Sequence, residues 1–295
     1  MKLVRFGMRG AEKPGLVAAD GTLRDLSQHV RDVTPDVLDE SRLAQLARLD
    51  HGRLPAVAGD VRLGAPLAQV GKIVCAGLNY RDHALEAGMS IPDEPILFMK
   101  AVTALSGPND PVTLPPGAEK TDWEVELAVV IGRVARRVPV SAALDHVAGY
   151  CVANDISERA YQLEHGGQWV KGKSYDNFAP LGPWLVTRDE AGSVAERSLW
   201  LEVNGCRLQD GNTRDLIFAV PWLVSYISRY MTLNPGDLIL TGTPSGVGLG
   251  QKPPVFLKSG DVMRLGIEGL GEQRQEVRGD DSPDLAPAAR VELDA

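Results

Sequence analysis

The chain has 295 residues, of which 44% are hydrophobic and 24% charged, an ordinary composition for a water-soluble globular protein. Its formal net charge is −8 and it has no basic run, so we expect neither nucleic-acid binding nor binding to acidic membranes. The sequence has no signal-peptide core and no membrane-spanning apolar stretch, and its three cysteines are widely spaced outside any CxxC pair, so we expect a reducing, cytoplasmic location.

Residues 1–65 are predicted to form a small N-terminal α+β domain. Leu3–Phe6 and Gly15–Ala18 have the short apolar pattern of strands, and Thr34–Leu49 has helical character. A connector rich in glycine, proline and alanine, residues 56–71, then leads into the rest of the chain.

Residues 72–279 are predicted to form a strand-rich catalytic domain. The expected strands are Ile73–Ala76, Ile96–Phe98, Val125–Ile131, Tyr150–Ala153, Leu199–Val203, Leu238–Thr241 and Val262–Ile267, and the expected helices are Asp82–Ala87, Ser157–Glu164 and Phe218–Tyr230. We therefore predict an α+β fold dominated by a strongly curved mixed sheet. Residues 280–295 lack periodicity and are expected to form a loose C-terminal tail.

Two glutamates stand at the start of an apolar strand. Glu124 and Glu126 are two residues apart and therefore share one face, and the run Leu127–Ile131 is apolar on both faces, which predicts a buried strand. Neighbouring buried carboxylates repel each other and lose hydration, and a hard cation relieves both costs. The alternative is an exposed strand end on which both glutamates are solvated.

Asp155 follows the next apolar strand and is a candidate third ligand. The sequence Asp-Ile-Ser-Glu at this point is also typical of a helix N-terminus, so Asp155 could equally be a capping residue. An all-oxygen ligand set would favour Mg²⁺ or Mn²⁺, with Ca²⁺ as a further occupant, over Zn²⁺.

His83 and Glu86 are three residues apart on an expected helix and would share a face. The carboxylate can orient the imidazole, which would make His83 a general base. An ordinary exposed helix pair is the alternative. The loop that follows, residues 88–94, contains glycine and proline and could let this helix act as a lid.

Two glycine-rich segments have the spacing of nucleotide-binding loops but lack the required context. Gly167–Ser174 fits the P-loop pattern, yet Trp169 occupies a position that needs a small residue and no helix propagates afterwards. Thr241–Gly250 follows a strand, but Pro253 and its neighbour Pro254 stand where a helix should begin. We expect the second loop to bring backbone close to a substrate, with a purely structural turn as the alternative.

These motifs occur in an order that resembles the fumarylacetoacetate hydrolase family. The resemblance runs from about residue 72 to 269 and rests on Glu124-x-Glu126, Asn154-Asp155-Ile-Ser-x-Arg159, Lys173 and Gly236–Gly248. It implies the family's curved sheet and a site in which Glu124, Glu126 and Asp155 bind Mg²⁺ or Mn²⁺. The larger animal enzyme has an additional aspartate seven residues before its catalytic histidine. This chain has Ala76 there and so resembles the smaller, three-carboxylate members.

The resemblance also implies roles for the remaining pocket residues. His83 and Glu86 would activate water, Lys173 would stabilise an oxyanion, and Arg159, Gln162, Gly242 and Thr243 would bind substrate. The residues alone leave other interpretations open. Arg159 could pair with Glu158 or Glu164, and Lys173 could be a surface lysine, although Lys171 suits that role better.

The expected reaction is metal-dependent C–C hydrolysis of a small 2,4-dioxo acid, an acylpyruvate or a 2,4-diketo-3-deoxy sugar acid, to pyruvate and a second acid. The stretch from Glu164 to Ser174 resembles the branch that acts on the sugar acids, and Trp169 with its polar neighbours would suit a polyhydroxylated tail. Relatives also include oxaloacetate decarboxylases, isomerases of the 2-hydroxyhepta-2,4-diene-1,7-dioate type and ureidoglycolate lyases, and they are usually homodimers. The non-enzyme alternative is a protein that binds a metal or a small acid.

Overall fold

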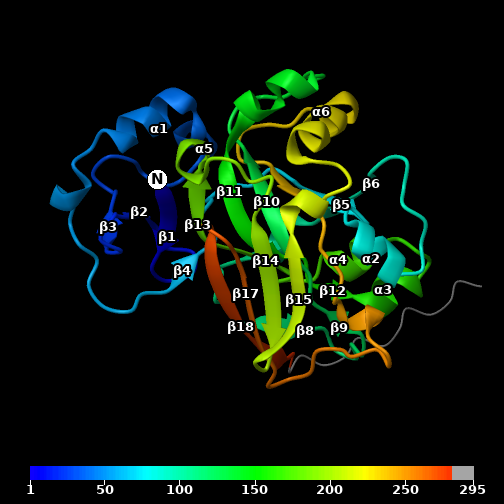
Figure 1. The fold of residues 1–295 in the computed structure, drawn as a ribbon. Helices are drawn as coiled ribbons and strands as arrows, with labels where there is room; N and C mark the ends of the chain where they lie inside the picture. The colour runs from blue at the N-terminus through cyan, green and yellow to red at the C-terminus, as the bar shows by residue number, and fades with distance from the viewer. Residues whose placement is uncertain (281–295) are drawn as a thin grey trace, which may run out of the picture.

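The fold was analysed in a computed structural model that describes residues 1–280 (Figure 1). Its largest sheet contains β1 (Lys2–Phe6), β2 (Lys13–Val17), β3 (Leu23–Asp25), β4 (Leu63–Gly64), β5 (Ile73–Gly77), β6 (Ile96–Lys100), β7 (Leu105–Ser106), β10 (Val125–Ile131), β11 (Val147–Asn154), β13 (Ala179–Thr187) and β16 (Leu238–Leu240). A second sheet contains β8 (Val112–Leu114), β14 (Ser198–Val203), β15 (Cys206–Asn212), β17 (Val262–Ile267) and β18 (Gly271–Gly279). The short strands β9 (Thr121–Asp122) and β12 (Ser157–Glu158) pair with each other.

The helices are short and lie around these sheets. The α-helices are α1 (Glu40–Ala47), α2 (Arg81–Glu86), α3 (Arg159–Leu163), α4 (Val170–Lys173), α5 (Arg188–Ala191) and α6 (Val220–Tyr230). The 3₁₀-helices are η1 (Pro35–Leu38), η2 (His51–Arg53), η3 (Val102–Ala104), η4 (Val140–His146), η5 (Thr213–Asp215) and η6 (Gly248–Gly250). None of the helices in the described part of the chain is long and apolar enough to cross a bilayer.

The core of the protein lies between the two main sheets. The large sheet has the order β3-β2-β1-β13-β11-β10-β16-β5-β6, and the second has the order β15-β14-β17-β18-β8. All seven residues of β10 are buried: β14 and β17 of the second sheet cover one face, and apart from Glu126 the strand is apolar on both faces. Gln273 on β18 joins the layers by donating to the carbonyls of Val152 (2.7 Å) and Gly182 (3.1 Å). The predicted α+β fold with dominant mixed sheets is confirmed.

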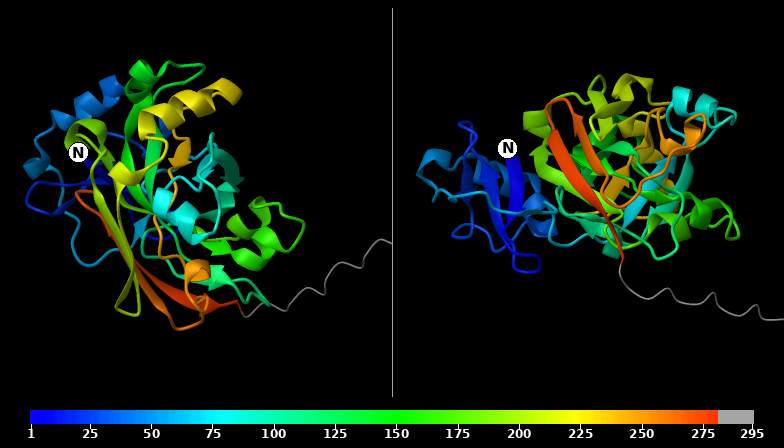
Figure 2. Two further views of the ribbon diagram at one scale, coloured as in Figure 1. Left: turned by 45° about the vertical axis from the view of Figure 1, so that its right-hand side comes forward. Right: turned by 90° about the horizontal axis from the view of Figure 1, so that it is seen from below.

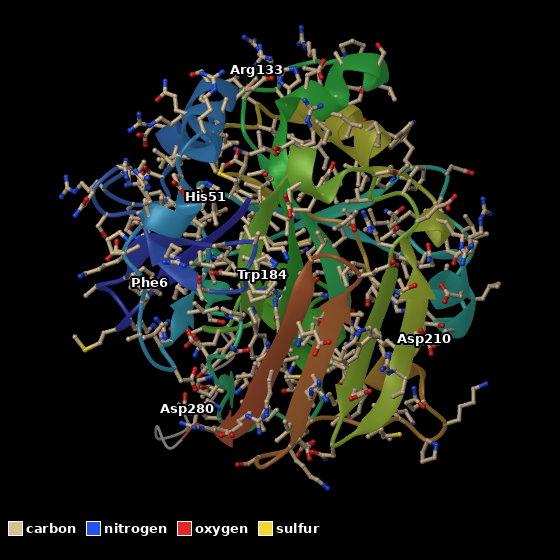
Figure 3. The ribbon with its side chains drawn as sticks, turned by 60° about the vertical axis from the view of Figure 1, so that its left-hand side comes forward. Phe6, His51, Arg133, Trp184, Asp210 and Asp280 are labelled. Carbon is tan, nitrogen blue, oxygen red and sulfur yellow. The ribbon has the colours of Figure 1, made fainter. Side chains whose placement is uncertain are left out.

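The N-terminal strands continue the large sheet. β1 pairs antiparallel with β2 and also with β13, where Leu3 lies opposite Leu185. Figure 2 shows these strands projecting to one side of the molecule, and Figure 3 shows Trp184 between them and the β17–β18 hairpin. The ammonium of Lys2 lies 5.2 Å from the centroid of the Trp184 ring. A separate N-terminal domain over residues 1–65 stays a prediction, and of the expected tail only Asp280 lies within the described residues.

An ion-pair network also ties the N-terminal strands to the large domain. Arg62 donates to both carboxylate oxygens of Asp110, each at 2.7 Å, and to Glu12 at 2.9 Å. Burial would raise the pKa of Asp110, but its hydrogen bonds with Arg62 lower that pKa below its usual value. Arg62 is 30% exposed, so solvent partly screens these pairs.

We expect Arg62→Met to lower the free energy of unfolding by about 1–3 kcal/mol at pH 7, because it removes three hydrogen bonds from the guanidinium to Asp110 and Glu12. The lowered pKa of Asp110 stabilises the fold above the unfolded pKa of about 4, and this contribution is lost as the pH falls through the folded pKa. Urea unfolding at pH 7 and below pH 4 should therefore show a smaller difference at the lower pH. Arg274→Met, which removes an exposed pair with Glu276, is the control and should cost little. Equal stability of Arg62→Met and wild type at pH 7 would contradict the expectation.

Candidate active site

Three acidic side chains meet where β10 and β11 lie side by side. Glu124 directly precedes β10, Glu126 lies within it, and Asp155 directly follows β11. The antiparallel register places Val125 opposite Asn154, and the backbone N–H of Asp155 donates to the carbonyl of Glu124 at 2.9 Å. One carboxylate oxygen from each acid lies within 4.8 Å of the others, and all three residues are buried. The structure thus brings the predicted ligands together, and the exposed-strand alternative is wrong.

Cationic side chains compensate the charge of Glu124 but not that of Glu126. Burial would raise the pKa of Glu124, but Lys173 and Arg159 hold that pKa far below its usual value. Burial raises the pKa of Glu126 well above its usual value, and the neighbouring carboxylates of Asp155 and Glu124 raise it further. A divalent cation would remove this repulsion, and an all-oxygen set of three carboxylates suits Mg²⁺ or Mn²⁺.

Asp155 does not cap a helix. The expected helix over Ser157–Glu164 is wrong in its first two residues, because these pair as β12 with β9 instead. Helix α3 begins at Arg159, and its N-cap is Glu158, whose side chain accepts from the backbone N–H of Ala160. The Asp155 carboxylate accepts instead from the ammonium groups of Lys173, at 2.8 Å, and Lys100.

Lys100 and Asp122 belong to the site although the sequence interpretation missed both. Lys100 ends β6, is 2% exposed, and donates to Asp155 and to the carbonyl of Ile156 (3.0 Å). A lysine after a short apolar strand is typical of a surface position, so no sequence signal could have found it. Asp122 offered a signal, because it stands two residues before Glu124 and extends the same alternation.

Arg159 is held by acids on several sides. Its Nε lies 2.9 Å from Asp122, its Nη2 lies 2.7 Å from Glu124, and its Nη1 donates to Oε1 of Gln162 at 3.0 Å. The alternative pairing is not formed, because Glu164 pairs with Lys120 and the Glu158 carboxylate binds backbone N–H groups. Arg159 therefore holds Glu124 in place, and its predicted grip on a substrate carboxylate stays a prediction.

Lys173 is a buried cation in the middle of the site. Its ammonium donates to Glu124 and to Asp155, each at 2.8 Å, and lies 5.0 Å from the centroid of the Phe98 ring. Burial would lower the pKa of Lys173, but Asp155 and Glu124 raise it above its usual value, so Lys173 stays charged. The surface-lysine alternative is wrong for Lys173, whereas Lys171 does lie at the surface and donates to the carbonyl of His165.

The His83–Glu86 pair lies on α2 as predicted. Nδ1 of His83 is 3.4 Å from Oε2 of Glu86, and His83 is 9% exposed, so the exposed-pair alternative is wrong. Glu86 also accepts from the backbone N–H of Gly246, and Asp82 accepts from the N–H and hydroxyl of Ser245. Two carboxylates therefore fasten α2 to the glycine loop.

The glycine loop holds the metal-site strand as well. The backbone N–H of Gly242 donates to Oε2 of Glu126 at 2.8 Å. Gly242 has φ +99°, and a Cβ there would lie 2.8 Å from Cβ of Asn79, so this close approach requires glycine. The Thr243 hydroxyl donates to the carbonyl of Val125 at 2.9 Å and accepts from Gln209 at 2.8 Å. Both residues thus position β10, and their predicted contacts with substrate stay predictions.

A cavity of about 390 Å³ joins these groups. The predicted site residues that line it are His83, Glu86, Glu124, Glu126, Arg159, Gln162, Lys173, Gly242 and Thr243, and Ala76 lines it where the larger animal enzyme has its fourth acid. Asp155 is fully buried and is not among the lining residues, but it pairs with Lys173, which is. The rings of Trp169 and Phe98 meet edge to face at 5.3 Å in the cavity wall. Helices α2, α3 and α4 cluster beside β5 and β6 around this site (Figure 1).

Comparison with known proteins identifies the family of residues 72–278. Residues 72–278 match the family described as fumarylacetoacetate (FAA) hydrolase C-terminal. A protein from Burkholderia ambifaria (strain MC40-6), which carries only the provisional name of a hydrolase, is 57% identical over 279 residues, covering 94% of this chain and 99% of that protein.

Two solved structures from different enzymes share the fold. Maleylpyruvate hydrolase from Sphingobium sp. SYK-6, solved in complex with manganese(II) ion and pyruvate, is 31% identical with a TM-score of 0.79, covering 95% of this chain and 99% of that one. The 2-hydroxyhepta-2,4-diene-1,7-dioate isomerase from Mycobacterium marinum is 34% identical with a TM-score of 0.73, covering 96% and 100%. The chain belongs to the fumarylacetoacetate hydrolase family, whose members include both hydrolases and isomerases.

Proposed function

We propose that the protein is a metal-dependent hydrolase that cleaves the C3–C4 bond of a small 2,4-dioxo acid. Water adds to the C4 carbonyl, the bond to C3 breaks, and the products are pyruvate, a second carboxylate and one proton. The observation that carries this proposal is the His83–Glu86 pair, which lines the same cavity as Glu124 and Glu126. Cleavage by water needs a base near the electrophilic C4 carbonyl of the substrate, and His83 is placed to be that base.

Each of the chain's own groups has a defined task in this reaction. A divalent cation held by Glu124, Glu126 and Asp155 would supply a Lewis acid for the 2-oxo acid end of the substrate. Glu86 accepts at Nδ1 of His83, which leaves Nε2 of the imidazole to take a proton from water. Lys173 keeps its charge beside the cavity and can stabilise an oxyanion there, with the Gln162 amide as a further donor.

Hydrolysis is favoured over two related reactions by the same pair. Decarboxylation of oxaloacetate and isomerisation of an unsaturated 2-oxo diacid both need charge stabilisation at the acid cluster, but neither needs an attacking water. A histidine oriented by a carboxylate at the cavity wall is the feature that water activation requires. Isomerisation is the second candidate, because His83 could also move a proton within a substrate and one structural relative is an isomerase.

A substrate panel tests the proposal. Acylpyruvates, a 2,4-diketo-3-deoxy sugar acid, oxaloacetate and ureidoglycolate are each assayed with Mg²⁺, with Mn²⁺ and with EDTA. We expect pyruvate and a second acid from the dioxo acids, with activity lost in EDTA and restored by metal. Activity that EDTA does not change would contradict the metal site, turnover of oxaloacetate alone would assign a decarboxylase, and metal binding without any turnover would assign a binding protein. The homodimer and the cytoplasmic location remain proposals from the resemblance and the composition.

A further inference from the structure

The outer part of the cavity is apolar, in contrast to its acidic and basic inner end. Met89, Leu163 and Leu249 line the cavity and are 47%, 48% and 39% exposed, so they form its rim. Trp169 and Val247 line the cavity as well. Glu124, Glu126 and Lys173 are at most 4% exposed and form the inner end. A substrate that binds at the acid cluster therefore extends its tail toward hydrocarbon side chains.

The arginine and the lysine that line the cavity both lie at its inner end and are both paired with acids. Among the described residues, Arg159 and Lys173 are the only arginine and lysine that line the cavity. Lys173 is paired with Glu124 and Asp155, and Arg159 is paired with Glu124 and Asp122. The cavity wall carries two further acids: Glu126 at the inner end, and Glu86, which accepts from the backbone N–H of Gly246.

From this distribution of charge we infer that the physiological substrate carries a single carboxylate, and that the group beyond its reacting C4 carbonyl is short and uncharged. This inference rests on the proposed hydrolysis of a 2,4-dioxo acid. A second carboxylate on the tail would lie against Met89, Leu163 or Leu249, in a cavity whose arginine and lysine are both already paired with acids. The cavity of about 390 Å³ lies near the small end of the usual range for ligand sites, which suits a tail of a few atoms.

The inferred substrate differs in charge from those named for both structural relatives, because the maleyl group of maleylpyruvate also ends in a carboxylate. The isomerase from Mycobacterium marinum is named for a dioate, a molecule with a carboxylate at each end. An acyl group and a short hydroxylated sugar tail are both uncharged, so both classes of 2,4-dioxo acid remain compatible with the apolar rim. Charge on the tail is thus the property that the cavity selects against, rather than polarity as such.

Three synthetic acids of equal chain length test the inference with the full-length, Mg²⁺-loaded protein. They are 2,4-dioxoheptanoate, 2,4-dioxoheptanedioate and the 7-amide of the latter, which matches the dioate in size but has no tail charge. Release of pyruvate gives kcat/KM for each, and calorimetry with the His83→Asn variant gives the three affinities without turnover. We expect kcat/KM and affinity for the dioate to be at least about tenfold below those for the amide, because the apolar rim replaces part of the hydration of its tail carboxylate and offers no cation in return. The amide and heptanoate should agree within about threefold.

A gain-of-function variant provides the second arm. Leu163→Lys adds a cation at the rim and should improve kcat/KM for the dioate relative to the amide by about tenfold, since an opposite charge then faces the tail. Leu163→Gln, of similar size without charge, is the matched control and should leave the ratio unchanged. Equal kcat/KM and equal affinity for the dioate and the amide in the wild-type cavity would overturn the inference.

The failure of the proposed function can be told apart from the failure of this inference. If none of the three acids is cleaved but their affinities keep the expected order, C–C hydrolysis is wrong and the preference for an uncharged tail stands. If all three are cleaved at the same rate and bind equally, the hydrolysis stands and the preference is wrong. If none of them binds, both are wrong.

Discussion

Replacing Glu126 with glutamine is expected to lower kcat/KM at least about 1,000-fold, the effect of losing several kcal/mol of charge stabilisation from a bound metal. Glu124 and Asp155 each contact two cationic side chains, whereas Glu126 is held by the backbone N–H of Gly242. Burial and the two neighbouring acids raise the pKa of Glu126, so its negative charge is the one that most needs a metal ion. A neutral amide removes that need while keeping size and shape.

Metal affinity and turnover should therefore fall together in Glu126→Gln. A calorimetric titration with Mn²⁺ gives the metal affinity of the variant, which we expect to be at least about tenfold weaker than that of the wild type. Glu158→Gln is the matched control: Glu158 is also fully buried, but its oxygens accept from the Lys120 and Ala160 backbone and from the Thr121 hydroxyl. That variant should keep wild-type metal affinity, with any loss confined to thermal stability. Wild-type Mn²⁺ affinity in Glu126→Gln would remove Glu126 from the ligand set.

Glu86→Gln should lower kcat by about 10²–10⁴-fold with little change in metal affinity, the range expected when general-base catalysis is lost. The Glu86 carboxylate lies 3.4 Å from Nδ1 of His83 and offsets the positive charge that the imidazole carries once it has taken a proton from water. A neutral amide can hold the ring but cannot stabilise that charge. The measurement is steady-state kinetics with the best substrate of the panel, together with Mn²⁺ titration.

A control on the same helix separates base orientation from simple anchoring of α2. Asp82 fastens α2 to Ser245, as Glu86 fastens it to Gly246, but Asp82 is not among the residues that line the cavity. Asp82→Asn should therefore change KM by a few-fold and leave most of kcat. If the two variants lose kcat equally, Glu86 acts only as an anchor and the water-activating pair is the wrong assignment.

Local sequence patterns predicted the strands and the acid cluster well, for a physical reason. The period of two in a strand places Glu124 and Glu126 on one face, and the unbroken apolar run after them indicates burial on both sides. The exposed, solvated interpretation of the glutamates is excluded by partners from distant segments, because Arg159 and Lys173 donate to Glu124 and the Gly242 backbone donates to Glu126. Burial also decided between the two interpretations of Lys173, and that is a property of the packed molecule.

Contacts between distant segments account for what the sequence could not reveal. Lys100 reaches Asp155 across 55 residues, and Arg159 reaches Glu124 across 35. Residues 157–158 have a helical sequence pattern, yet they pair with β9 as a short strand. The helix therefore begins later, at Arg159, and Glu158 is its N-cap. Propensity is a weak local preference, and a partner strand that is available only in the folded chain overrides it.

Because β1 pairs with β13, the large sheet begins well before the first residue of the family match. The family match begins at residue 72, but the hydrogen-bonded neighbour of β13 is supplied by residues 2–3. A fragment that began at residue 72 would expose β13 as an open sheet edge, with unpaired backbone groups able to recruit a strand from another molecule. For expression and crystallisation, the useful minimal unit is therefore the chain from its first strand onward. In that unit β1 covers the edge of β13 that would otherwise be open to a strand from another molecule.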